Sequence, residues 1–302
     1  MILRSNKRWV TVALLTILML SASCVRRTAV TQDFGLPAKS ASRIPSFRPI
    51  LQKQSGAFDP LSDDARVQEL QGRLKVNGDD AAARLELAGV FESYRLYDDA
   101  IEQYSQGLHT SFAEQAILGL ARCEQASGRI REAIPHLEAF LKKRQAVNVW
   151  NQLGLLYDGA GDLASGEHAF REAVRLNTES DRLHNNLGYN LLMQKKMEAA
   201  ESEFRKALEL NEASATSHNN LGSVLARRGD LQAALEQFQF AADPATAHNN
   251  LAVVLLEAGQ YEASREELVK ALAIRRNFAP ALANFKLVQE KIRNGAEGAS
   301  SK

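Results

Sequence analysis

The chain has 302 residues, of which 45% are hydrophobic and 24% are charged, and its formal net charge is +1. This composition is ordinary for a folded protein with a continuous apolar core, and the near-zero charge gives no reason to expect nucleic acid as a partner. The two cysteines, Cys24 and Cys123, exclude a disulfide framework apart from a single pair, so the more economical interpretation of Cys123 is a buried small hydrophobe.

Residues 1–23 carry the features of a secretory signal peptide. Basic residues precede an apolar run from Trp9 to Leu20, and small residues then lead to Cys24. The run is short for a transmembrane helix, so we expect cleavage. Because it ends on a cysteine, the segment resembles a bacterial lipoprotein signal, in which Cys24 becomes the acylated first residue. Ser21 stands where such signals prefer Leu, which leaves ordinary cleavage and an uncleaved anchor as alternatives.

The residue after the cysteine bears on localisation. Val25 stands where lipoproteins held in the inner membrane often have Asp, so the resemblance implies the outer membrane, with the protein facing the periplasm. Residues 24–60 then predict the lipidated cysteine and a flexible tether, since they are rich in Ser, Arg, Pro and Ala and show little periodicity. Contact of the tether's basic residues with anionic lipid headgroups is an alternative.

The middle of the chain is a repeat array. After an N-terminal capping helix at 61–80, the tetrapeptide His-Asn-Asn-Leu begins at His184, His218 and His248, at steps of 34 and 30 residues. The small residue that follows it belongs to a longer series: Ala88, Ala121, Gly154, Gly188, Gly222 and Ala252. Sixteen residues after each member stands a bulky one: Tyr104, Leu137, Phe170, Phe204, Phe238 and Leu268. Small residues let two helices approach closely and the large one fills the groove, so each unit predicts two antiparallel helices.

These residues resemble the tetratricopeptide repeat (TPR) family over 81–278. The resemblance implies an all-α solenoid, a right-handed superhelix of about six helix pairs with capping helices. The predicted units are 81–113, 114–146, 147–180, 181–214, 215–244 and 245–278. The fifth unit is four residues short, so we expect its second helix to lose about one turn. Asp243 is then placed to cap a helix that begins at Pro244. Residues 279–294 predict a C-terminal capping helix, and 295–302 a disordered tail.

No pattern for catalysis or for a cofactor appears: nucleophile elbow, phosphate-binding loop and metal-protease motifs are all absent from the sequence. The three repeated histidines do not predict a metal site, because helix axes pack about 8–10 Å apart and zinc ligands must lie about 2 Å from one ion. We expect them to pack within their helix pairs, and we expect the protein not to be an enzyme.

The repeated asparagines are the candidate binding residues. In the TPR family the first helix of each unit lines a concave groove, and an Asn before the Leu-Gly pair often faces it. The resemblance places Asn186, Asn220 and Asn250 there, with Asn185, Asn219 and Asn249 beside them and Tyr189 one turn further on. An amide can bond a peptide backbone of any sequence, because it both donates and accepts. The alternative is that one Asn of each pair ties adjacent helices together.

The signal ending at Cys24, the Asn-Asn-Leu-Gly units and the shortened unit together resemble the lipoprotein of the tight-adherence (Tad) pilus and secretion system. This implies protein partners such as an outer-membrane secretin, a membrane contact through the lipid, and a role in assembly or localisation of the machine. The alternatives are a periplasmic adaptor for peptidoglycan enzymes and a pilotin for a type IV pilus.

Overall fold

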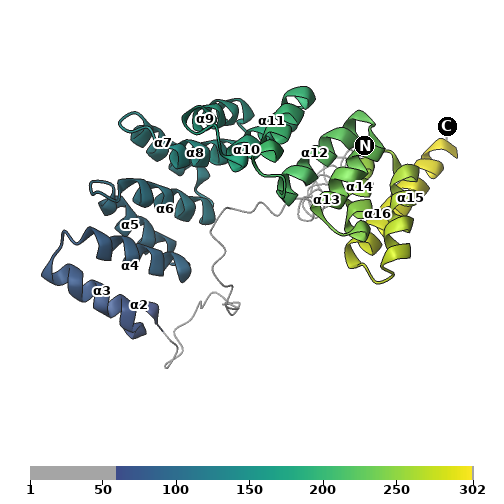
Figure 1. Ribbon diagram of the computed structural model, residues 1–302. Helices are drawn as coiled ribbons and strands as arrows, with labels where there is room; N and C mark the ends of the chain where they lie inside the picture. Colours follow the sequence, from purple (N-terminus) through teal and green to yellow (C-terminus); the bar gives the residue numbers. More distant parts are fainter. Residues whose placement is uncertain (1–58, 301–302) are drawn as a thin grey trace, which may run out of the picture. The chain divides into compact units, whose positions relative to one another are not determined.

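The computed structural model describes residues 59–300 of the chain. The predicted signal peptide, Cys24 and nearly all of the predicted tether lie outside the described residues. Between 59 and 300 the backbone forms α-helices joined by short turns, without a strand (Figure 1). The predicted all-α fold class is confirmed.

Most helices form consecutive antiparallel pairs. The pairs are α4 (Ala81–Ser93) with α5 (Tyr97–Gly107), α6 (Ala113–Ala126) with α7 (Ile130–Leu141), α8 (Val147–Ala160) with α9 (Leu163–Leu176), α10 (Asp181–Met193) with α11 (Met197–Leu210), and α14 (Pro244–Glu257) with α15 (Tyr261–Ile274). Between the last two pairs in the chain come α12 (Ala215–Arg228) and α13 (Leu231–Ala241). We call α4, α6, α8, α10, α12 and α14 the first helices, and their successors the second helices.

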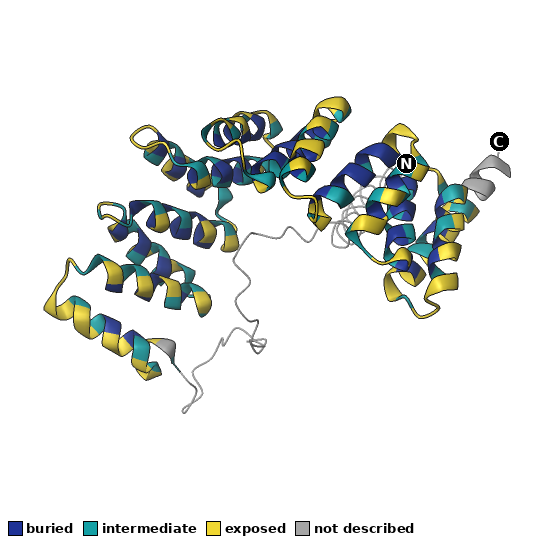
Figure 2. Cartoon of the chain, viewed as in Figure 1, coloured by how far each residue is buried: buried dark blue, intermediate teal, exposed yellow. Residues whose placement is uncertain are grey.

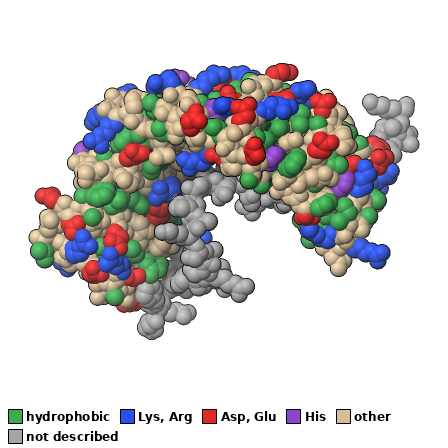
Figure 3. All heavy atoms as spheres, in the orientation of Figure 1, with side chains coloured by type: hydrophobic (Ala, Val, Ile, Leu, Met, Phe, Trp, Pro, Cys, Tyr) green, Lys and Arg blue, Asp and Glu red, His purple; other side chains and the backbone are tan. Residues whose placement is uncertain are grey.

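The chain divides into two compact units within α12. Among the described residues, 59–224 belong to one unit and 225–300 to the other. Each unit has its own core, and the buried side chains lie on the faces where paired helices meet (Figure 2). Acidic and basic side chains are interspersed on the visible surface, in keeping with the net charge of +1 (Figure 3). None of the helices among residues 59–300 is long and apolar enough to cross a membrane.

Close approach of the paired helices depends on a small residue in the first helix and a bulky residue sixteen positions later in the second. We call this pattern the small–large register. A Cβ added to Gly154 would lie 2.6 Å from Cε1 of Phe170, and one added to Gly188 would lie 2.7 Å from Cε1 of Phe204. Both rings are fully buried. The ring therefore rests directly on the backbone of the first helix, and a larger residue at the glycine would push the helices apart.

Capping helices lie at both ends of the array. At the N-terminal end lie α2 (Pro60–Asp63) and α3 (Ala65–Val76), and α3 buries Val67 and Leu70 against α4. At the C-terminal end α16 (Ala279–Ser300) packs on α15 and buries Ala281 and Val288. The backbone is helical through 295–300, where the sequence predicts a disordered tail. No proline follows Pro280, and the helix continues past Gly295 and Gly298.

The shortened fifth unit has the form that the sequence predicts. Its second helix, α13, has 11 residues, three fewer than α9, α11 and α15, while α5 also has 11 and α7 has 12. Asp243 caps α14, because its Oδ1 accepts the backbone N–H groups of Ala245 and Thr246 at 3.1 and 3.3 Å. Pro244 occupies the first helical turn, where its missing N–H costs no hydrogen bond. The loss of about one turn therefore falls on α13, and α14 begins with its own cap.

The isolated thiol is a core residue. Cys123 is free and fully buried in α6. Burial raises the pKa of the Cys123 thiol to about 12, so the side chain is uncharged at neutral pH. This confirms its interpretation as a small hydrophobe.

Two glycines of α8 test the importance of the ring contact. Gly154→Ala places a methyl group 2.6 Å from Phe170 Cε1, closer than two non-bonded carbon atoms can approach. We therefore expect it to destabilise the protein by about 1–3 kcal/mol. Gly159→Ala is the matched control, since its Cβ would meet only Ile130 Cδ1, at 3.6 Å. It should stabilise the helix by about 0.4–1 kcal/mol. Urea unfolding measures both changes. Equal effects of the two substitutions would show that the ring contact does not set the helix spacing.

Candidate functional site

The repeated asparagines form a ladder between first helices. Asn186 Nδ2 donates to Asn151 Oδ1 at 2.7 Å, and Asn220 Nδ2 donates to Asn185 Oδ1 at 2.9 Å. In the C-terminal unit, Asn284 Nδ2 of α16 donates in the same way to Asn249 Oδ1 at 2.9 Å. Each bond joins residues 35 apart in the sequence, so it crosses from one repeat to the next.

The two amides of a dipeptide have different structural roles. The first accepts a bond from the following repeat, as Asn185 does, and the second donates to the preceding repeat, as Asn186 does. Asn220 and Asn249 are each only 7% exposed, and Asn185 and Asn186 are partly buried. This geometry favours the alternative that the sequence left open, in which asparagines tie adjacent helices.

The ladder does not use up the hydrogen-bonding capacity of these amides. Asn186 uses only its Nδ2, as a donor. Asn185 uses only its Oδ1, which accepts hydrogen bonds from Ser217 and Asn220. Among the described residues, no buried side-chain nitrogen or oxygen lacks a hydrogen-bond partner. The remaining Asn186 Oδ1 and Asn185 Nδ2 therefore reach solvent, where they can meet a ligand. An amide has two donors and two acceptor lone pairs, so both roles are compatible.

The other predicted binding residues lie on the same helices. Tyr189 stands one turn after Asn185 on α10 and is partly buried, as are Asn219 on α12 and Asn250 on α14. Each of these three residues also makes an interaction within the protein. Asn219 belongs to one compact unit and Asn250 to the other.

Further polar links extend the ladder towards the N-terminal repeats. Arg122 Nε and Nη2 donate to the two carboxylate oxygens of Glu92, each at 2.9 Å, and Gln152 Nε2 donates to Gln125 Oε1 at 3.3 Å. Burial opposes ionisation of Glu92, but Arg122 brings its pKa below the usual value. We define the first-helix face of residues 59–224 by these linked side chains: Glu92, Arg122, Gln125, Asn151, Gln152, Asn185, Asn186 and Asn220. It is a mainly amide surface with a single ion pair.

The repeated histidines join helices and do not converge. His184 Nδ1 lies 2.6 Å from Glu203 Oε2, and His248 Nδ1 lies 2.7 Å from Glu267 Oε2, each pair linking the two helices of one repeat. His218 Nε2 lies 2.9 Å from the backbone oxygen of Glu212. No group of three or more His, Cys, Asp or Glu within residues 59–300 is arranged to hold a metal ion.

The structure contains a buried polar cluster that the sequence does not predict. Asn190 Nδ2 donates to Asp158 Oδ1 at 2.6 Å and to the Leu163 carbonyl oxygen at 3.0 Å, and thus links α10 to α8 and α9. Beside it, Glu167 accepts from Gln194 Nε2 at 2.7 Å and from Lys196 Nζ at 2.6 Å. Burial raises the pKa of Asp158 to about 6, although the bond from Asn190 opposes the rise. Nothing about Asp158 within its own repeat signals this, because its partner lies 32 residues away.

Family models described as tetratricopeptide repeat match residues 151–215, 198–245 and 245–277. A search of curated proteins finds no match. Among solved structures, a chain of the APC/C hetero-tetramer Cut9–Hcn1 is 20% identical with a TM-score of 0.52, over 74% of this chain and 45% of that one. This protein therefore spans less than half of that chain's length.

Two bacterial structures match over most of their own length. Pseudomonas aeruginosa PilF has a TM-score of 0.53 at 16% identity, covering 70% of this chain and 97% of its own. A tetratricopeptide repeat protein from Parabacteroides merdae ATCC 43184 has a TM-score of 0.52 at 15% identity, covering 74% and 90%. At these identities the likeness concerns the fold alone.

The raised pKa of Asp158 predicts a pH-dependent stability. Because the folded pKa of about 6 exceeds the ordinary 3.8, ionisation of Asp158 opposes folding, and its cost grows as pH rises from about 4 to 6. Asp158→Asn keeps an acceptor for Asn190 without the charge. We expect the variant to melt at a higher temperature than the parent at pH 7.5, with a smaller gap at pH 4.5. Thermal unfolding at the two pH values measures this, and a gap independent of pH would contradict the assignment.

Proposed function

Because the chain is a tetratricopeptide repeat protein, we propose that it is a lipid-anchored scaffold that binds protein partners along its first-helix face. In this role it assists assembly or localisation of an outer-membrane pilus or secretion machine of the Tad type. The observation that carries the proposal is the amide ladder, which links first helices of consecutive repeats and leaves Asn186 Oδ1 and Asn185 Nδ2 of α10 outside its bonds.

The chemistry of this face suits the backbone of an extended partner segment. Asn186 Oδ1 can accept from a peptide N–H, and Asn185 Nδ2 can donate to a peptide carbonyl oxygen, whatever the partner's sequence. A neutral amide contributes on the order of 1 kcal/mol per hydrogen bond, so useful affinity requires several repeats to bind together. The ladder supports this requirement because it fixes the amides of neighbouring helices relative to one another.

Support for the envelope role comes from the sequence. The signal-like segment ending at Cys24 and the resemblance to the Tad lipoprotein favour acylation and an outer-membrane position facing the periplasm. Acyl chains contribute about 0.8 kcal/mol per buried methylene, so more than one chain is needed for durable attachment. Partners on this proposal are proteins, with a secretin foremost, and the function requires no cofactor and no catalytic residue.

The predicted binding asparagines are tested by a triple substitution with a matched control. Asn186/Asn220/Asn250→Ala removes one predicted binding amide from each of three repeats. Asn177/Asn211/Asn277→Ala removes three exposed turn asparagines instead. We expect the first variant to recover at least tenfold less secretin in crosslinking and pulldown from cells, and the control to match the parent. Circular dichroism verifies that both are folded.

Two outcomes of this experiment contradict the proposal in different ways. Unchanged recovery with the first variant would remove the asparagines from the binding mechanism. Recovery of peptidoglycan hydrolases in place of a secretin would replace the pilus role with that of an adaptor for envelope enzymes.

Lipid anchoring has its own test. Cys24→Ala removes the acceptor of the acyl chains, so the protein should move from the membrane fraction to the soluble fraction after fractionation in high salt. Cys123→Ala, which alters the buried thiol, should leave the distribution unchanged. Membrane association of the Cys24→Ala protein that resists salt would show that the anchor is not the lipid.

A further inference from the structure

In several repeats, a pair of polar side chains at equivalent positions joins the first helix to the second. Arg84 Nη1 donates to Gln103 Oε1 at 3.1 Å. The corresponding pairs are His184 with Glu203 and His248 with Glu267, and in all three the residues are 19 positions apart. The pair fills the space between the start of the first helix and the middle of the second.

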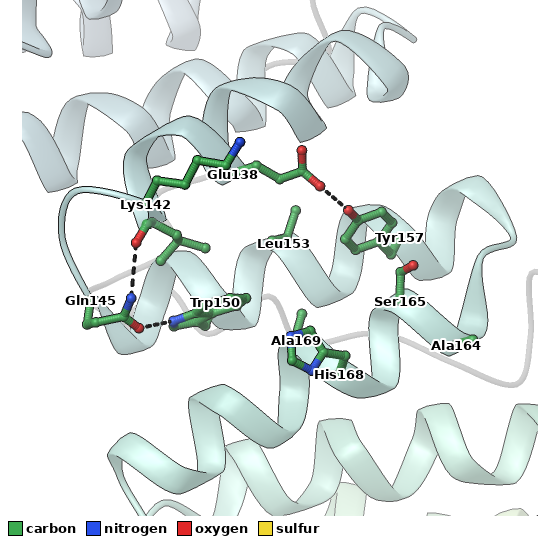
Figure 4. A pocket seen from close by; sticks show the side chains of 11 residues that line it. Glu138, Lys142, Gln145, Trp150, Leu153, Tyr157, Ala164, Ser165, His168 and Ala169 are labelled. Carbon is green, nitrogen blue, oxygen red and sulfur yellow. Dashed lines mark hydrogen bonds between the residues drawn. The ribbon is translucent and has the colours of Figure 1, made fainter.

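The repeat at 147–180 departs from this pattern. Its two corresponding positions hold Trp150 and Ala169, so the second helix offers no polar side chain to the first. Trp150 instead donates its Nε1 to Gln145 Oε1 at 2.8 Å, and its ring meets the edge of the His168 ring with centroids 5.9 Å apart. A pocket of about 780 Å³, open to solvent, lies at this place between α7, α8 and α9 (Figure 4).

The pocket has an apolar floor and an aromatic rim. Leu141, Leu153 and Ala169 form the floor, and each is at most 3% exposed. Trp150 and Tyr157 stand on α8 at its rim (Figure 4). Its volume is in the range of ligand sites, and such a floor takes a bulky apolar side chain.

Two charged side chains of α7 and the turn after it give the pocket a polar side. The Tyr157 hydroxyl donates to Glu138 Oε1, and burial together with this carboxylate raises the pKa of Tyr157 to about 12. Tyr157 therefore stays protonated and keeps its bond to Glu138. Among the described residues Glu138 forms no ion pair, and neither does Lys142 one turn further on. A carboxylate beside aromatic rings suits a cation, and the ammonium of Lys142 suits a peptide carbonyl oxygen.

We propose that this pocket is a second protein-binding site, separate from the first-helix face, for an extended segment that presents a bulky apolar side chain next to an arginine or lysine. The apolar side chain lies on the floor between Trp150 and Tyr157, the basic side chain pairs with Glu138, and Lys142 donates to the segment's backbone. The inference goes beyond the proposed function, because it holds whichever partner binds the first-helix face.

The pocket contains its own fluorescent probe. The chain has two tryptophans, so Trp9→Phe in the full chain leaves Trp150 as the single emitter. The probe is a blocked hexapeptide, Ala-Ala-Phe-Arg-Ala-Ala, and the control peptides replace its Phe with Ala or its Arg with Glu. We expect a saturable change in Trp150 emission with the first peptide and at least tenfold weaker binding of both controls. Equal binding of all three peptides would overturn the proposal.

Variants of the protein locate the site. Ala169→Glu restores the acidic residue that two other repeats have, and it should weaken binding at least tenfold. Ala139→Glu makes the same change at an exposed position of α7 that does not line the pocket, and binding should stay within twofold of the parent. Equal effects of these two substitutions, or none from Ala169→Glu in a folded protein, would contradict the assignment.

Because Ala169 is buried, a second variant keeps the test independent of folding at that position. Glu138→Gln retains an acceptor for Tyr157 and removes the charge, so the preference for Arg over Glu in the peptide should disappear while the preference for Phe over Ala persists. An unchanged preference for Arg would exclude Glu138 as the partner of the basic residue. The Asn186/Asn220/Asn250→Ala protein should bind the hexapeptide like the parent, and a loss there would show that the two sites are not separate.

Discussion

The rest of the structure depends on the close approach of the two helices in each repeat. In two of the repeats an aromatic ring of the second helix lies on the backbone of the first at a glycine, as Phe170 does at Gly154 and Phe204 does at Gly188. A single pair of this kind leaves apolar surface exposed on its outer faces, so neighbouring repeats must cover it. In the core of residues 225–300 the corresponding positions hold Ala252 and Leu268. Capping helices such as α3 cover a terminal face.

The amide ladder is a second link between repeats and has a different physical character. Apolar packing is tolerant of sliding, whereas a hydrogen bond such as Asn186 to Asn151 fixes one helix in register with the next. In α10 the polar links also leave Asn185 Nδ2 and Asn186 Oδ1 outside the ladder. On the proposed function, the same side chains would serve both stability and binding of an extended segment.

Much of the fold follows from the sequence because repetition turns long-range contacts into a visible period. The small–large register predicted the helix pairs, and the missing residues with Asp243 and Pro244 predicted the shortened α13 and the cap of α14. Features that depend on a partner in another repeat were harder to foresee. The environment of Asp158 depends on its bond to Asn190, which lies in the next repeat. The pocket lies where Ala169 takes the position of a polar partner for Trp150. The sequence leaves the role of the Asn-Asn pairs between two alternatives, since a dipeptide does not reveal which neighbour each amide faces.

Coupling of one repeat to the next by the amides is tested most directly by a double-mutant cycle between Asn151 and Asn186. Urea unfolding of Asn151→Ala, Asn186→Ala and the double variant gives their interaction free energy, which is the part of the two changes that is not additive. The ladder predicts a favourable coupling of about 0.5–1.5 kcal/mol, the net value of a hydrogen bond. Additive effects, with no coupling between the two residues, would contradict it.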